Sequence, residues 1–165
     1  MQARAATKAD AGAISRIYNQ GIEERVSTFE TRLRTPQDVE AWFDGTHPVV
    51  VVEDDEGQII AFASTSTYRP RDCYAGIAEF SVYTAREARG RGAGRMAMVA
   101  LIDAAEHAGF WKLVSRIFPE NRASLALMRS LGFREVGIYE KHARLDGMWR
   151  DVVIVEKLLG PNIEE

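Results

Sequence analysis

The chain has 165 residues, of which 46% are hydrophobic and 27% are charged, and its formal net charge is −3. This length and composition are typical of one globular domain over residues 1–165, and they exclude a disordered chain. No apolar run is long enough to cross a bilayer and the first residues lack an apolar secretion segment, so we expect a cytoplasmic protein without a membrane partner. The single cysteine, Cys73, excludes an internal disulfide, and the three histidines lack partners at metal-ligand spacing, so no metal is expected. The acidic balance argues against a nucleic-acid partner.

Capping residues and hydrophobic periodicity divide the chain into helical and extended segments. Thr7 and Asp10 resemble a capping box, which opens a helix whose residues Ile14, Ile17 and Tyr18 face inward. Helices are predicted over 7–24, 35–43, 93–108 and 121–131, and strands over 49–53, 59–68, 76–83, 112–118, 134–142 and 148–158. This order predicts an α/β fold with a mixed, mostly antiparallel sheet flanked by helices. Its two strand–helix–strand steps allow one parallel pair.

A turn rich in glycine and arginine connects the strand at 76–83 to the next helix. Four arginines and one glutamate give residues 86–95 a net charge of +3, which leaves −6 for the rest of the chain. Glycines allow a ligand to approach the backbone, and the free N–H groups at a helix N-terminus attract anions. The turn is neither a Rossmann fingerprint, which requires glycine instead of Arg95, nor a P-loop, which requires lysine instead of Arg95 after the last glycine. We expect it to bind a pyrophosphate; the alternative is a flexible loop without a ligand.

The turn resembles a known signature. Its residues 89–94, Arg-Gly-Arg-Gly-Ala-Gly, fit the Arg/Gln-X-X-Gly-X-Gly/Ala motif of the GNAT superfamily of N-acetyltransferases, and residues 121–124 with 131–133 resemble that superfamily's second cofactor segment. The resemblance covers nearly the whole chain and implies the GNAT fold, acetyl-CoA as acetyl donor and N-acetyltransferase activity. It also implies cofactor contacts by Val82, Tyr83 and Thr84 with the pantetheine arm, by Arg89, Gly90, Arg91, Gly92, Ala93, Gly94 and Arg95 with the pyrophosphate, and by Asn121 and Ser124 from the other side. Asn121 could equally be an ordinary helix N-cap.

Glu79 is the candidate general base. Strand alternation places it on one face with Ile77, Ser81 and Tyr83, a few residues before the turn. A carboxylate there could take a proton from the ammonium form of an amine. The alternative is a solvated glutamate on an exposed face. The superfamily commonly places a tyrosine or histidine seven residues after the asparagine to protonate the leaving thiolate, but this chain has Met128 there, so the general acid stays unassigned.

Within the superfamily, the chain resembles the phosphinothricin, arsinothricin and methionine sulfoximine acetyltransferases. The resemblance lies in residues 18–19, 28–30, 69–71, 74, 79–83 and 147–151. It implies acetylation of the α-amine of a small amino-acid analogue, and thereby resistance through detoxification. Pro70 favours an extended Arg69, so Arg69 and Arg71 project to the same side and suit two oxyanions of one substrate. Phe29 and Tyr74 are expected to wall the substrate pocket; two solvated arginines on an exposed loop are the alternative.

Other functions fit parts of the same pattern. A GNAT enzyme could instead acetylate a peptide N-terminus, a polyamine or an aminoglycoside, although cationic acceptors would favour an acidic groove. A non-catalytic CoA-binding module is a further alternative. Relatives are often homodimers, and the apolar segment 152–155 could support a dimer interface or form part of the core.

Overall fold

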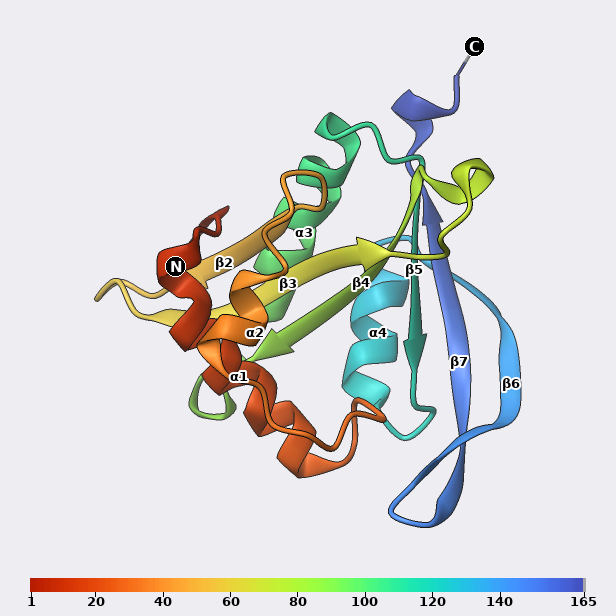
Figure 1. The fold of residues 1–165 in the computed structure, drawn as a ribbon, viewed down its shortest axis with the longest axis horizontal. Coiled ribbons are helices and arrows are strands. Elements are labelled where there is room, and N and C mark those ends of the chain that lie inside the picture. The colour runs from red at the N-terminus through yellow and green to blue at the C-terminus, as the bar shows by residue number, and fades with distance from the viewer. Residues whose placement is uncertain (165) are drawn as a thin grey trace.

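The computed structural model describes residues 1–164, which form one seven-stranded sheet flanked by helices (Figure 1). The strands follow the spatial order β1-β2-β3-β4-β5-β7-β6. They are β1 (Gln2–Ala5), β2 (Val49–Glu53), β3 (Ile59–Thr67), β4 (Ile77–Thr84), β5 (Lys112–Ile117), β6 (Arg134–Leu145) and β7 (Met148–Leu158). Neighbouring strands are antiparallel except β4 and β5, which pair in parallel. The predicted mixed sheet and its parallel pair are therefore confirmed.

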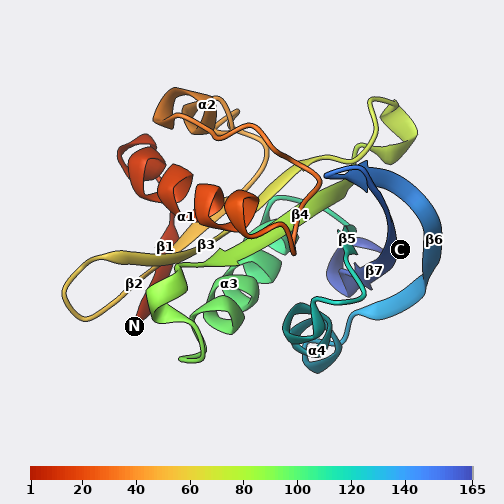
Figure 2. The same cartoon turned by 90° about the horizontal axis from the view of Figure 1, so that it is seen from below.

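Four α-helices cover the two faces of the sheet. They are α1 (Ala11–Glu24), α2 (Pro36–Glu40), α3 (Ala93–His107) and α4 (Arg122–Ser130). Figure 2 shows α1 and α2 on one face and α3 and α4 on the other. The helices and strands bury one large apolar cluster around fully buried residues such as Phe62, Met98 and Leu101. A smaller cluster around Phe118 and Val152 lies where β5 meets β7.

Helix α1 follows its predicted pattern. The Thr7 N–H donates to the Asp10 carboxylate at 2.8 Å, and a short 3₁₀ turn at Lys8–Asp10 leads into the helix. Ile14 and Ile17 are buried as expected. The Tyr18 ring is half-buried, with its centroid 5.2 Å from that of Tyr83 on β4. The amphipathic face of α1 thus packs directly against the strand that carries the candidate base.

Several element boundaries differ from the predictions. The strand β1 was not predicted; its four residues extend the sheet by pairing with β2. Helix α2 ends at Glu40 instead of residue 43, because the Trp42 N–H bonds to the Val39 carbonyl three residues back and tightens the last turn. β6 continues to Leu145, beyond the predicted end at residue 142, and meets Met148 across the predicted two-residue turn. Residues 152–155 are buried between β5 and β6, so this segment is core.

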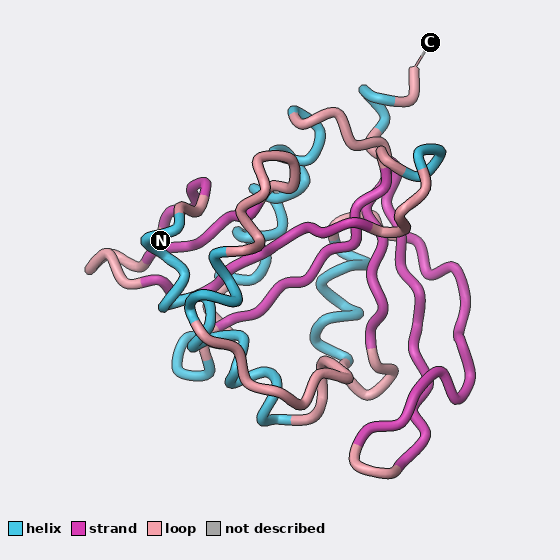
Figure 3. Tube along the Cα trace, in the orientation of Figure 1, coloured by secondary structure: helices cyan, strands magenta, loops and turns pink. Residues whose placement is uncertain are grey.

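Within residues 1–164, no helix has both the length and the apolar character needed to cross a membrane. The long connection between α1 and α2, residues 25–35, has no regular secondary structure (Figure 3).

The contact between α1 and β4 depends on the absence of a side chain at Gly21. A Cβ atom there would lie 2.6 Å from the Tyr83 ring, closer than carbon atoms can pack. We therefore expect Gly21→Ala to lower the free energy of unfolding by about 1–3 kcal/mol, measured by urea denaturation. Gly12, in the same helix, has open space around its Cβ position, so Gly12→Ala is the control and should leave stability unchanged or slightly higher. Equal effects of the two substitutions would contradict this packing argument.

Candidate active site

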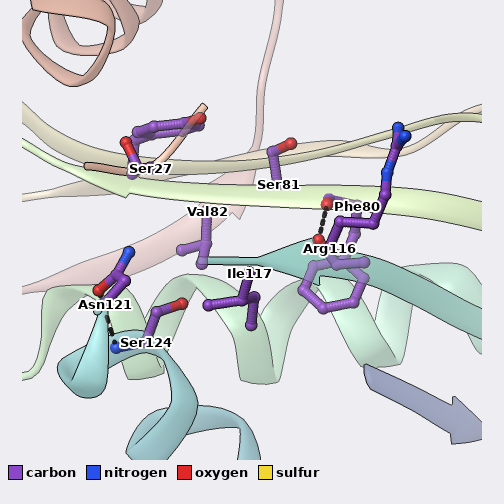
Figure 4. A pocket seen from close by; sticks show the side chains of 10 residues that line it. Ser27, Phe80, Ser81, Val82, Arg116, Ile117, Asn121 and Ser124 are labelled. Carbon is purple, nitrogen blue, oxygen red and sulfur yellow. Dashed lines mark hydrogen bonds between the residues drawn. The ribbon is translucent and has the colours of Figure 1, made fainter. Parts of the chain in front are cut away.

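The site is built around an opening in the sheet. β4 and β5 pair only through Ile77–Glu79 and Lys112–Val114, while β5 stays paired with β7 up to Ile117. At the point of separation the Ser115 hydroxyl donates to the Phe80 carbonyl at 2.8 Å (Figure 4). Among residues 1–164, no strand pairs with the β5-facing edge of β4 beyond that point. Its backbone amide groups are therefore available to a ligand.

A groove of about 420 Å³ lies beside this open edge, between the glycine-arginine turn and the N-terminus of α4; we call it the turn groove. Eleven predicted cofactor residues line it, namely Val82, Tyr83, Thr84, Arg89, Gly90, Gly92, Ala93, Gly94, Arg95, Asn121 and Ser124. The twelfth, Arg91, lies away from the groove, in a separate surface hollow with Asp54, Asp55 and Glu56.

The turn presents backbone N–H groups to this groove. Gly90 and Gly92 have φ angles of +79° and +84°, a left-handed conformation that glycine adopts without strain. The Met96 N–H bonds to the Gly92 carbonyl at 3.0 Å, so the free N–H groups of the first turn of α3 belong to the three residues before it. Together with the helix dipole, these groups attract an anion.

Arginines reinforce the turn in two different ways. Arg89 Nη1 donates to Glu24 Oε2 at 2.7 Å, which joins the turn to the C-terminal end of α1. The Arg89 hydrogen bond lowers the pKa of the Glu24 carboxyl. Arg95 Nη1 donates to the Ser130 hydroxyl at 2.7 Å and therefore connects α3 to α4 along the groove wall.

At the opposite wall, Asn121 is the N-cap of α4 and also lines the turn groove. Its Oδ1 accepts the Ser124 N–H at 3.3 Å as the N-cap of α4, and both residues line the groove. In Figure 4 the Ser124 side chain lies below Val82, beside the opening. Met128 is only 1% exposed and belongs to the large apolar cluster, so its side chain is part of the core.

A second cavity of about 280 Å³ lies on the side of the opening that carries Glu79; we call it the Glu79 cavity. The Glu79 carboxylate is 27% exposed there, and Arg116 Nη2 lies 3.1 Å from its Oε1. Predicted residue Phe29 forms part of the wall and contacts Phe118 edge-on, with ring centroids 4.9 Å apart. The other lining residues are Tyr18, Ser27, Thr28, Glu30, Ser66, Phe80, Ser81, Tyr83, Ser115 and Val152.

A narrow junction of about 50 Å³ lies between the turn groove and the Glu79 cavity (Figure 4). Ser27 and Tyr83 line all three spaces and therefore form a wall that the three spaces share. Burial raises the pKa of Tyr83, so its hydroxyl stays protonated at neutral pH.

The irregular segment 25–35 forms the roof of the Glu79 cavity, and the β6–β7 hairpin fixes its start. Arg25 Nε lies 3.1 Å from the Asp146 carboxylate in the hairpin turn. The Arg150 guanidinium lies 4.3 Å from the centroid of the Phe118 ring and donates to the Arg25 carbonyl at 3.4 Å. These contacts position Ser27, which follows two residues later.

The remaining predicted substrate residues lie beside the Glu79 cavity and do not line it. Arg69 is exposed, with its guanidinium 5.0 Å from the centroid of the Tyr68 ring, and Arg71 is exposed as well. Tyr74 contacts Tyr68 edge-on, and both pack against the apolar cluster that includes Phe118 and Val152. This loop therefore borders the cavity through its aromatic residues.

Four residues that line the Glu79 cavity were not predicted as site residues from the sequence, namely Ser27, Thr28, Glu30 and Arg116. Residues 27–30 come from an irregular loop whose path no periodicity predicts, although 28–30 carried part of the family resemblance. Arg116 reaches the site because β5 lies next to β4 in the sheet, which is a property of the topology.

Comparison with known proteins identifies the family of this chain. The model of the acetyltransferase (GNAT) family matches residues 16–133. The chain belongs to this family. It is 33% identical to a phosphinothricin N-acetyltransferase of Streptomyces coelicolor, covering 96% of each protein, and 32% identical to an L-methionine sulfoximine/L-methionine sulfone acetyltransferase of Pseudomonas paraeruginosa, covering 96% of this chain and 94% of that one. The structure of a GNAT phosphinothricin acetyltransferase from Sinorhizobium meliloti in complex with acetyl-CoA superimposes with a TM-score of 0.90 at 29% identity, covering 98% of this chain and 90% of that one.

The protein is therefore an N-acetyltransferase that uses acetyl-CoA as its donor. The residues of the turn groove fit this donor, because free N–H groups and Arg95 suit a pyrophosphate while the open edge of β4 can pair with the amides of a pantetheine arm. When bound, the donor supplies an acetyl group as a thioester.

Arg95 lines the turn groove and Arg91 does not, so substituting each of them tests whether acetyl-CoA binds in this groove. We expect Arg95→Ala to weaken acetyl-CoA binding about 10- to 100-fold in isothermal titration calorimetry, since Arg95 lines the groove and could no longer offer a charge-assisted hydrogen bond to a phosphate there. Arg91→Ala is the matched control from the same turn and should change the affinity much less. Equal losses in both variants would instead support the sequence-based prediction that Arg91 also contacts the donor.

Proposed function

We propose that this enzyme acetylates the α-amine of a small amino-acid analogue of the phosphinothricin, arsinothricin or methionine sulfoximine type. The observation that carries the proposal is the position of Glu79, in a small cavity that shares the wall residues Ser27 and Tyr83 with the turn groove. The Streptomyces and Pseudomonas relatives, a phosphinothricin and a methionine sulfoximine acetyltransferase, support this class of acceptor. Acetylation of such compounds would confer resistance by detoxification.

Glu79 is the residue we assign to proton transfer. An α-amine is mostly protonated at neutral pH and becomes a nucleophile only after it loses a proton. Glu79 would accept that proton, directly or through a water molecule, from an amine in the cavity. The reaction forms a C–N bond to the acetyl carbon and breaks the thioester C–S bond, and the departing sulfur takes up a proton. Backbone N–H groups on the open edge of β4, such as that of Val82, are suited to polarise the thioester carbonyl.

Arg69 and Arg71 are proposed to attract the oxyanions of the substrate from the border of the cavity. Their loop packs against the cavity wall through Tyr68 and Tyr74, and both arginines are exposed, with the Arg69 guanidinium against the Tyr68 ring. Phe29 would contact the aliphatic part of the substrate from the opposite side. The cavity volume, about 280 Å³, suits a single small molecule and supports this class over a polypeptide acceptor.

A panel of acceptors tests the proposal. Release of free thiol from acetyl-CoA is followed with phosphinothricin, arsinothricin, methionine sulfoximine, a polyamine, an aminoglycoside and a short peptide. We expect turnover with the amino-acid analogues. Reaction of only the cationic amines or the peptide would contradict the proposed substrate class, and binding of acetyl-CoA without turnover of any amine would indicate a non-catalytic module.

Substitution of each of the two glutamates that line the cavity distinguishes a catalytic role of Glu79 from a general effect of removing a negative charge. We expect Glu79→Gln to lower kcat by about 10²- to 10⁴-fold, the usual contribution of a general base, without changing acetyl-CoA affinity. Glu30 lines the same cavity but is paired with Arg34 at 2.6 Å, so Glu30→Gln is the control and should retain most of the turnover. Equal kcat values for Glu79→Gln and the unchanged enzyme would exclude Glu79 as the base.

We also propose that the enzyme is a homodimer, each subunit a single domain, and that it acts in the cytoplasm. The dimer is supported by the edge strand β6, which exposes Val136, Ile138 and Tyr139 to 45–58% next to the exposed Met148 and Trp149. Light scattering during gel filtration should give a mass near twice the chain mass of 18.4 kDa, and Ile138→Lys should shift it towards the monomer. A monomeric mass for the unchanged protein at micromolar concentration would contradict the dimer.

A further inference from the structure

Arg116 is the one cationic side chain among the described residues that line the Glu79 cavity. The cavity also contains two carboxylates, but Glu30 is neutralised by Arg34 from outside. The remaining charges are the Glu79–Arg116 pair, so the cavity presents one negative and one positive group to an acceptor.

The position of this pair is fixed by the sheet. Glu79 on β4 is in register with Val114 on β5, and Arg116 follows two residues later on the same face. Arg116 itself is in register with Ile154 on β7, so its backbone remains held where β4 and β5 separate. An ion pair whose two backbones belong to paired strands is already well ordered. Few side-chain and backbone conformations are therefore lost when a ligand binds to it.

The guanidinium group of Arg116 keeps most of its donors free. Its Nη2 lies 3.1 Å from Glu79 Oε1 and 3.4 Å from Glu79 Oε2. Among residues 1–164, no hydrogen-bond acceptor contacts its Nε or Nη1, and 47% of the side chain is exposed. A guanidinium carries five N–H donors in a planar fork that matches a carboxylate. The unused N–H groups of Arg116 can therefore donate to a second carboxylate.

We propose that Arg116 binds the α-carboxylate of the acceptor while Glu79 receives the α-ammonium group. In an α-amino acid these two groups are bonded to the same carbon, and their opposite charges complement the Glu79–Arg116 pair. The pair thus orients the amine at the base and selects acceptors that carry a carboxylate next to it. This inference rests on the proposed function and deepens it, leaving the bordering Arg69 and Arg71 for the phosphinate, arsinate or sulfoximine oxygen at the other end of the substrate.

The inference is tested with phosphinothricin and methionine sulfoximine, each compared with its α-carboxamide, which keeps the amine and removes the carboxylate charge. The unchanged enzyme should prefer the free carboxylates. Arg116→Gln should lower kcat/KM for them roughly 10- to 100-fold, mainly through KM, and leave the carboxamides within about twofold. Arg116→Lys should recover part of the loss, because it restores the charge without the fork.

Arg129→Gln is the matched control, because Arg129 also pairs with a glutamate, Glu135, but on the surface away from the cavity. It should leave the preference unchanged. Thermal unfolding and acetyl-CoA affinity of each variant verify that the fold and the turn groove are intact.

Two results separate this inference from the proposed function. Equal losses for carboxylates and carboxamides in Arg116→Gln, or a preference that survives the substitution, would overturn the role of Arg116 and leave the proposed function standing. Failure of the unchanged enzyme to acetylate either amino-acid analogue, while other amines react, would overturn the proposed function and this inference with it.

Discussion

The parallel pairing of β4 and β5 stops at Glu79 and Val114, and the backbone groups beyond this point must find other partners. One of them, the Phe80 carbonyl, is satisfied by the Ser115 hydroxyl. The following edge of β4 faces a space that reaches from the turn groove to the Glu79 cavity. The separation of the two strands therefore exposes the edge of β4 to which we assign the donor, next to the cavity to which we assign the acceptor.

Charge is distributed along this path according to the chemistry of the two substrates. At one end, free N–H groups and arginines suit a pyrophosphate, and Glu24 fixes Arg89 to α1 so that the turn keeps its place. At the other end, the Glu79–Arg116 pair provides one charge of each sign. The junction between them is lined by the neutral hydroxyl groups of Ser27 and Tyr83 and, together with the Glu79 cavity, by Arg116.

Much of the donor side of the site could be predicted because its residues are contiguous. Residues 82–84 and 89–95 form one strand–turn–helix segment, and local rules for glycine conformation and helix N-termini specify what such a segment binds. Arg91 is the one predicted donor residue of this segment that does not line the turn groove. It lies instead in the surface hollow beside the turn of the β2–β3 hairpin, and the packing of that hairpin next to the glycine-arginine turn is not a local property. The acceptor side was harder to predict from the sequence, since Phe29, Glu79 and Arg116 come from three segments that lie far apart along the chain.

The sequence by itself determined the α/β class, the helix starts at capping residues, and the positions of the glycine-arginine turn and of the candidate base Glu79, because hydrophobic periodicity, capping and turn chemistry act over a few neighbouring residues. Only the tertiary structure decided that β5 lies beside β4 and separates from it, that residues 152–155 are core, and that Arg116 faces Glu79 while Arg69 and Arg71 stay at the border. Strand neighbours and register depend on contacts between distant segments, which no local pattern encodes.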